Sequence, residues 1–220
     1  FLYLAILFWA SYNIRLGFYI KCFNKNSIHK NKVAISFDDG PDPINTPLIL
    51  DILKKYNAKA SFFIIGSKAE NNINLIKEIH SQNHLIANHS FNHSNWFPFK
   101  KNNAIKEEIL KTNKIIFEAT GNKNKYFRPP FGVTNPNIAK AANQLGLIVV
   151  GWSVRSFDTK NENSEIVLKR IIKKIKGGDI ILLHDKPVNS PEILEKLLAF
   201  MQQNNITSVS IDELITNKEI

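Results

Sequence analysis

Two adjacent carboxylates follow an early apolar run in this 220-residue chain. Asp38 and Asp39 come directly after residues 33–37, and Gly40-Pro41 ends the run behind them. Adjacent side chains leave an extended strand in opposite directions, so we expect the two acids to take different roles. One can bind a metal ion while the other stays free to act as a base. An ordinary Asp-Gly turn with two solvated carboxylates is the alternative.

Two histidines four residues apart, His89 and His93, follow a later apolar run. This spacing predicts a first helical turn that presents both imidazoles on one face, as two ligands of one ion require. With an acid from another strand end they would form a His, His, Asp set that leaves positions open for water and substrate. Surface or capping histidines are the alternative. His84, beside Leu85, is expected to be a core histidine or one that supports the site.

Two further residues have types that suit catalysis. Arg128 precedes the rigid pair Pro129-Pro130, which can aim its guanidinium at a carboxylate while backbone N–H groups point into a pocket. A structural salt bridge under a loop is the alternative. His184 ends an apolar run in which burial demands no histidine. It fits either a proton donor opposite the metal or a cap at the strand end.

Residues so far apart need a scaffold that brings strand ends together. Short apolar runs alternate with segments of helical period, which predicts repeated β-α units around a parallel sheet or barrel in one α/β domain. In a parallel barrel the carboxyl ends of the strands open on one face, so we expect these residues to converge on one pocket. The expected strands are 33–37, 60–65, 85–87, 126–127, 147–152, 179–183 and 206–210, and the expected helices are 46–56, 68–81, 103–119, 136–145, 164–176 and 191–203.

The composition limits the classes of partner. The 29 Lys and Arg exceed the 19 Asp and Glu, so the net charge is +10. This charge could favour an anionic cell-wall polymer, an anionic membrane surface or nucleic acid. We expect no nucleic acid, because the lysines are spread along the chain without an aromatic-interleaved basic patch. Cys22 is the only cysteine, so no internal disulfide can form and a thiol nucleophile is not expected.

The start of the chain is almost entirely apolar up to Arg15, and there is no initiator Met. We interpret residues 1–20 as the remnant of a membrane anchor, and residues 30–216 as a catalytic domain. An amphipathic first helix that docks on the core is the alternative, because so short a stretch cannot span a bilayer alone. We therefore expect an exported protein of the cell envelope, tethered to a membrane, and a monomer.

Five motifs, taken together, resemble the polysaccharide deacetylase family with NodB homology, which is carbohydrate esterase family four. The resemblance covers residues 32–214. The order and spacing of the motifs make the joint match specific, although each motif alone is a weak signal. The motifs are SFDDG at 36–40, HSFNH at 89–93, RPPFG at 128–132, RSFDT at 155–159 and LLH at 182–184.

The resemblance implies a distorted (β/α)7 barrel and hydrolysis of N-acetyl groups on an amino-sugar polymer, with release of acetate. The substrate would be peptidoglycan or a chitin-like polymer. It also implies one divalent ion, Zn²⁺ or alternatively Co²⁺, bound to Asp39, His89 and His93. An O-deacetylase of xylan-type polymers and a non-catalytic glycan-binding relative are the alternatives.

The same resemblance implies the catalytic roles. Asp38 would be the general base, oriented by Arg128, and His184 the general acid, supported by Asp158. A backbone N–H near Phe131 would help to stabilise the oxyanion. Leu182 would line the pocket for the acetyl group.

The fourth motif departs from the family pattern of Asp, two residues, then Asp-Trp. Arg155 stands in place of the first acid and Thr159 in place of the Trp, whereas Asp158 matches the second acid. Two arginines repel each other, so we expect Arg155 to turn away from Arg128, towards the substrate groove or another acid. Such a groove would favour anionic polymer.

Two tryptophans are candidates for a face that stacks on sugar. Trp152 and Trp96 could replace the missing Trp in the substrate groove. A half-buried structural role is the alternative for each.

Overall fold

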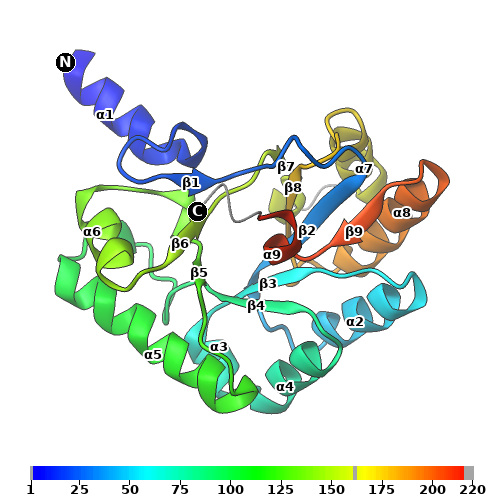
Figure 1. Cartoon of the computed structure of the whole chain (residues 1–220), viewed down its shortest axis with the longest axis horizontal. Helices are drawn as coiled ribbons and strands as arrows, with labels where there is room; N and C mark the ends of the chain where they lie inside the picture. The colour runs from blue at the N-terminus through cyan, green and yellow to red at the C-terminus, as the bar shows by residue number, and fades with distance from the viewer. Residues whose placement is uncertain (1, 161–162, 216–220) are drawn as a thin grey trace.

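The computed structural model describes residues 2–160 and 163–215, and shows one α/β domain around a curled parallel sheet (Figure 1). The β/α barrel expected from the sequence is confirmed. In the described chain no strand ladder joins the two end strands β1 and β7, so the barrel is open there. The strand order is β1 (Cys22–Phe23), β6 (Ile148–Val150), β5 (Tyr126–Phe127), β4 (Leu85–Asn88), β3 (Ser61–Ile64), β2 (Lys32–Gly40), β8 (Ile180–His184) and β7 (Val154–Arg155), and β9 (Thr207–Val209) also pairs with β2.

Helices connect the strands and cover the outer face of the sheet (Figure 1). They are α2 (Asn45–Lys55), α3 (Gly66–Glu70), α4 (Ile73–Ser81), α5 (Asn102–Thr120), α6 (Pro136–Gln144), α7 (Ser164–Ile172), α8 (Ser190–Gln203) and the short α9 (Ile211–Leu214). Single 3₁₀ turns are η1 (Ile14–Leu16), η2 (Phe97–Phe99), η3 (Pro130–Gly132) and η4 (Asp158–Lys160). The single helix expected over 68–81 is wrong. Asn71 and Asn72 side chains donate to the carbonyls of Ser67 and Lys68, each at 2.9 Å, and the helix is interrupted there.

Alternate residues along the strands pack into two apolar layers. In β8, Ile181 and Leu183 belong to the layer under the outer helices, whereas Ile180 and Leu182 belong to the other layer. The sequence alternates in this way because successive side chains of a strand point to opposite faces. Full burial of each such side chain contributes about 1.5–3 kcal/mol to folding. The packed strands therefore give the polar residues at their carboxyl ends a rigid base.

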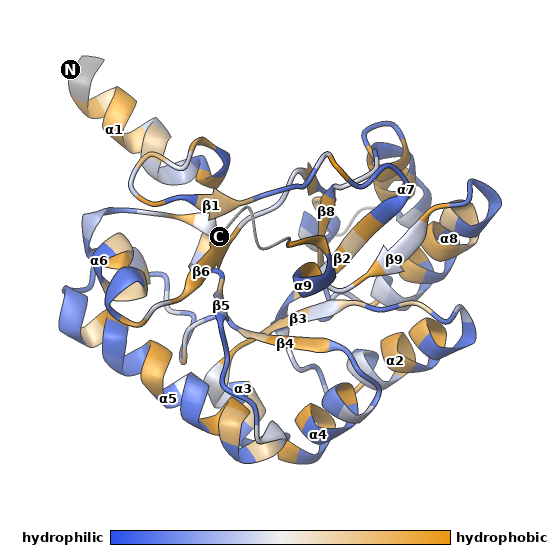
Figure 2. Cartoon of the chain, viewed as in Figure 1, coloured by the Kyte–Doolittle hydropathy of each residue, from blue (hydrophilic) through white to orange (hydrophobic). Residues whose placement is uncertain are grey.

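Helix α1 (Leu2–Tyr12) projects away from the domain (Figures 1 and 2). Leu4, Phe8 and Trp9 are each more than half exposed. Its carboxyl end is attached to the domain, because the backbone N–H of Thr134 donates to the carbonyl of Ser11 at 2.9 Å. Within the described residues, no helix has the length and apolar character needed to cross a membrane. Residues 1 and 216, the outermost positions of the two expected segments, lie outside the described residues.

Candidate active site

The polar residues at the strand ends meet at one end of the barrel. Asp38 of β2 is paired in parallel register with His184 of β8. His89 follows β4 directly, and its Nε2 lies 3.7 Å from an Asp38 carboxylate oxygen. Three segments that are distant in sequence therefore place acids and imidazoles within contact distance.

A bulge at the end of β2 brings both acids to the same place. The pairing of β2 with β3 shifts between Asp38 and Gly40, and Asp39 takes a left-handed backbone conformation with φ of 70°. Asp39 Oδ1 lies 3.5 Å from His89 Nε2, close to the group that Asp38 also faces. The expectation that the two side chains leave in opposite directions is wrong, because the bulge ends the regular alternation. Lys68 Nζ fixes the turn by donating to the Asp39 carbonyl at 2.6 Å.

A loop, and not a helical turn, brings His89 and His93 together. Ser90 and His93 have φ values of 67° and 49°, so the segment reverses through left-handed residues. The helical turn expected from the spacing is therefore wrong. The imidazoles still converge, with ring centroids 4.7 Å apart. Backbone N–H groups fix the loop: that of Ser90 donates to Asn88 Oδ1 at 2.8 Å, and that of His93 donates to Ser90 Oγ at 3.1 Å.

The Asp39, His89 and His93 cluster fits a divalent cation. His89 Nδ1 lies 2.7 Å from the Arg128 carbonyl, which can only accept, so Nδ1 carries the proton and Nε2 offers its lone pair. His93 Nε2 lies 3.3 Å from Asp39 Oδ1, a buried oxygen without a hydrogen-bond partner in the described residues. One ligand atom from each residue lies within 4.8 Å of the others. Two imidazoles and a carboxylate without a donor form a suitable set for such an ion.

The charge states also suit metal binding. Burial alone would raise the pKa of the Asp39 carboxyl, but His89, His93 and His184 hold it below its ordinary value. Burial, and then the proximity of His89, lowers the pKa of His93 to about 4. A carboxylate and a neutral imidazole are the forms that bind metals, and both are present at neutral pH.

Arg128 holds Asp38 in place from inside the barrel. The Arg128 side chain is fully buried, and its Nη1 donates to Asp38 Oδ1 at 2.6 Å and to Ser36 Oγ at 2.9 Å. Its Nε and Nη2 donate to the carbonyls of Val150 and Gly151. A buried guanidinium with this many partners has one orientation, so it fixes the position of the Asp38 carboxylate.

His184 is held by Asp158. Its Nδ1 lies 2.8 Å from Asp158 Oδ1, and its backbone N–H donates to Asp158 Oδ2 at 2.7 Å. Burial alone would lower the pKa of His184, but the hydrogen bond and charge of Asp158 hold it above its ordinary value. The contact through Nδ1 leaves Nε2 as the nitrogen that can give a proton to a substrate.

The expected substrate residues lie at different depths. Phe131 is 42% exposed, and its ring centroid lies 4.7 Å from that of His93. Leu182 and Trp152 are buried, at 2% and 6% exposure, so they form the wall beneath the surface. Trp96 is 73% exposed, and Arg155 is also exposed at the end of β7.

Asp185, which the sequence analysis missed, joins the loops after β2 and β8. It is fully buried, and its Oδ2 accepts from Thr46 Oγ1 at 2.6 Å and from the backbone N–H of Asp42 at 3.2 Å. A Cβ at Gly40 would lie 2.1 Å from this oxygen, so only glycine fits beside it. Burial raises the pKa of Asp185 to about 6. The feature of the sequence that could have identified Asp185 is an acid directly after His184, at the end of an apolar strand.

Known proteins are similar to this chain in sequence. The polysaccharide deacetylase family model matches residues 25–150. The chain is 34% identical over 187 residues to the peptidoglycan-N-acetylglucosamine deacetylase PgdA of Listeria monocytogenes, a match that covers 85% of this chain and 39% of that relative. The chain thus spans about two fifths of the length of this curated relative.

Two solved structures have a similar fold. The Bc1960 peptidoglycan N-acetylglucosamine deacetylase has a TM-score of 0.83 at 30% identity, covering 87% of this chain and 91% of its own. BA3943 of Bacillus anthracis, described as a CE4 family pseudoenzyme, has a TM-score of 0.82 at 28% identity, covering 88% of this chain and 68% of its own.

Proposed function

The chain belongs to the polysaccharide deacetylase family, and from this premise we propose that it hydrolyses N-acetyl groups on an amino-sugar polymer and releases acetate. One observation carries the proposal. The Asp38 carboxylate, held by Arg128, lies beside the Asp39, His89 and His93 cluster, and His184 is paired with Asp38 in register. A base, an acid and a set of metal ligands are thus in reach of one substrate group.

The cluster of Asp39, His89 and His93 would hold one divalent ion, for which we propose Zn²⁺, with Co²⁺ as the alternative. A bound ion of this kind polarises a carbonyl oxygen and lowers the pKa of water. Neighbouring residues orient these ligands. The Arg128 carbonyl fixes the tautomer of His89, and Lys68 fixes the backbone of Asp39.

Asp38 takes the proton of the attacking water in this proposal. One of its oxygens is bound by Arg128, and the other faces His89, so the second oxygen is the one open towards the cluster. The water oxygen forms a bond to the acetamide carbon, and the proton passes to the carboxylate. A backbone N–H near Phe131 would bind the oxygen that gains negative charge.

His184 completes the reaction as the acid. Asp158 raises its pKa, so a larger fraction of the imidazole is protonated at neutral pH than in free histidine. Its Nε2 proton passes to the amine nitrogen as the carbon–nitrogen bond breaks, and acetate and a free amino sugar remain. The buried Leu182 would line the space for the acetyl methyl group.

An O-deacetylase would use the same residues on an ester, and a non-catalytic glycan-binding protein is the second alternative. The similarity to a CE4 family pseudoenzyme makes the latter worth testing. The assembled pairs Asp38 with Arg128 and His184 with Asp158 favour an enzyme, because a binding protein needs neither.

The names of the relatives support a cell-envelope role. Two of them are peptidoglycan deacetylases, so we propose peptidoglycan as the substrate of an exported, monomeric protein.

We also propose that residues 1–20 attach the catalytic domain, residues 30–216, to a membrane, since α1 exposes Leu4, Phe8 and Trp9. Vesicle flotation of the chain with and without residues 1–12 tests the attachment, and equal flotation would contradict it.

Release of acetate tests the proposed activity directly. The purified protein, loaded with Zn²⁺ or Co²⁺, is incubated with acetylated chito-oligomers, peptidoglycan or acetylxylan, and acetate is measured. We expect release from the amino-sugar polymers, and a rate lower by about a thousandfold from the Asp38→Asn variant. Release from acetylxylan alone would favour the O-deacetylase, and no release from any polymer would favour the binding protein.

A further inference from the structure

An exposed arginine lies on the same rim of the barrel as the catalytic residues. Arg155 ends β7 and is paired in parallel register with Leu182, two positions before His184. Asp158, which binds His184, follows three residues later. Because the strands are parallel, Arg155 stands at their carboxyl ends, where the site opens.

Aromatic rings hold the Arg155 guanidinium. Its Cζ lies 4.8 Å from the centroid of the Phe157 ring and 5.7 Å from that of the Trp152 ring. The buried Arg128 lies 5.6 Å from the same Trp152 ring, so this ring stands near both arginines. A guanidinium that contacts rings keeps its N–H edges available and loses little freedom on binding a ligand.

The positive charge of Arg155 is not neutralised within the described part of the chain. Arg155 makes no ion pair there, and the nearby Asp158 carboxylate is occupied by His184 and by the hydroxyl of Ser156. Lys160 is exposed too, and its Nζ lies 5.1 Å from the centroid of the same Phe157 ring. Arg170 Cζ lies 5.5 Å from that ring as well. The three cations repel one another, and an anion bound beside Arg155 and Lys160 would relieve the repulsion.

We propose that Arg155, assisted by Lys160, binds a carboxylate of the polymer beside the acetamido group that is hydrolysed. This inference rests on the proposed function and adds the residues that would recognise the charged group of an anionic glycan. A carboxylate is the matching ligand, because its two oxygens accept the paired N–H donors of a guanidinium. The carboxylate belongs either to a substituent of the sugar or to a peptide attached to the glycan.

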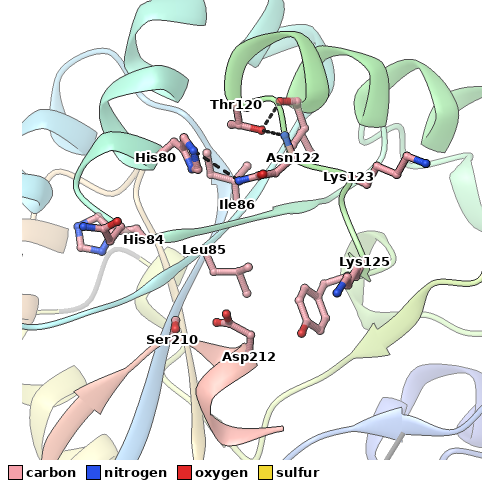
Figure 3. A pocket seen from close by; sticks show the side chains of 13 residues that line it. His80, His84, Leu85, Ile86, Thr120, Asn122, Lys123, Lys125, Ser210 and Asp212 are labelled. Atoms are coloured by element: carbon pink, nitrogen blue, oxygen red, sulfur yellow. Dashed lines mark hydrogen bonds between the residues drawn. The ribbon is translucent and has the colours of Figure 1, made fainter. Parts of the chain in front are cut away.

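Three N-acetylated oligosaccharides of equal length test the proposal. One is neutral, one carries a carboxyl group on its sugar substituent, and one carries a peptide carboxylate in addition. Their kcat/KM values are compared for wild type, Arg155→Gln and Arg155→Lys. Lys123→Gln is the control, because Lys123 is an exposed cation beside the cavity at the other end of the barrel (Figure 3).

We expect the preference for carboxylate-bearing over neutral glycan to fall about five- to tenfold in Arg155→Gln, mainly through KM. Arg155→Lys should keep part of the preference, because it keeps the charge without the paired donors. Lys123→Gln should keep all of it. A fall that already occurs with the sugar carboxylate identifies the sugar as the source, and a fall seen only with the third glycan identifies the peptide. An unchanged preference in Arg155→Gln would overturn the proposal.

Binding to an inactive protein separates this proposal from the proposed activity. The same glycans are titrated calorimetrically into Asp38→Asn protein, with and without Arg155→Gln, after circular dichroism has shown that both variants are folded. A loss of carboxylate preference on removal of Arg155 supports the subsite even if no acetate is ever released. Equal preference in both proteins contradicts the subsite and leaves the proposed activity unaffected.

Discussion

Strand β4 has a buried histidine at each end, and their surroundings differ. His84 precedes the strand and is 5% exposed, and His89 follows it and is 2% exposed. His84 Nδ1 lies 3.4 Å from the backbone N–H of Ala60, and its Nε2 has no hydrogen-bond partner within the described chain. His89 donates through Nδ1 and faces two carboxylates through Nε2.

Around the cavity at the His84 end, no carboxylate of the described residues forms an ion pair with the imidazole. It measures about 390 Å³, and its labelled side chains include Lys123, Lys125 and a single acid, Asp212 (Figure 3). Burial, and then the charge of Lys59, lowers the pKa of His84 to about 4. Burial thus makes an imidazole neutral, and the acids supplied by neighbouring strand ends make a reactive site.

Replacement of Asp38 should have the largest effect. In Asp38→Asn the amide cannot take a proton from water, so kcat should fall about a thousandfold. The affinity for Co²⁺, followed by its visible absorption, should stay within about threefold, since Asp38 is not among the proposed ligands. Full activity in this variant would remove Asp38 from the mechanism.

Paired substitutions at the two ends of β4 test the comparison itself. His89→Gln should weaken Co²⁺ binding about a hundredfold, because it removes one of the proposed ligands. His84→Gln is the matched control and should leave Co²⁺ binding unchanged, because His84 forms no ion pair with an acid among the described residues. Equal losses in both variants would show that fold stability, and not ligation, controls metal affinity.

The pH dependence should report the Asp158 contact. Because Asp158 raises the pKa of His184, the protonated acid persists to higher pH, and the alkaline fall in kcat/KM should lie above the ordinary histidine range. Asp158→Asn should move this fall to lower pH and reduce kcat about tenfold. An alkaline limb at the same pH in both proteins would exclude His184 as the acid.

The smallest effect concerns the stability contributed by His84. The pKa of His84 is lowered in the folded state. Its contribution to the free energy of unfolding is therefore complete at pH values above its pKa in the unfolded chain, and is lost as pH falls towards about 4. His84→Gln should therefore reduce the loss of stability between pH 6.5 and 4 by about 1–3 kcal/mol. Urea unfolding of both proteins at several pH values measures it, and parallel curves would contradict the assignment.

The sequence predicted most elements because their apolar periods were clear. The expected strands and helices lie close to the observed ones, with the interruption at Asn71 and Asn72 as the main difference. Strands β1 and β7 were missed because two residues show no period. Strand β5 is equally short, but both of its residues are aromatic, a type that favours strands. Strands β1 and β7 form the open edges of the barrel.

The site was predictable in its residue types and less so in its geometry. A carboxylate or imidazole directly after an apolar run marked Asp38, His89 and His184. The convergence of Asp38 with Asp39 depends on a bulge that residue spacing does not reveal. Asp185 was missed because its role is a contact between two loops that are distant in sequence.

The contact between Gly40 and Asp185 also constrains the evolution of this site. A side chain at position 40 collides with the Asp185 carboxylate, and a shorter residue at 185 leaves the Thr46 hydroxyl without its acceptor. Each single change is therefore harmful, although a joint change can restore the fit. Positions 40, 46 and 185 should covary among descendants of this sequence, and mutant libraries that randomise one position at a time should recover few active variants at position 40.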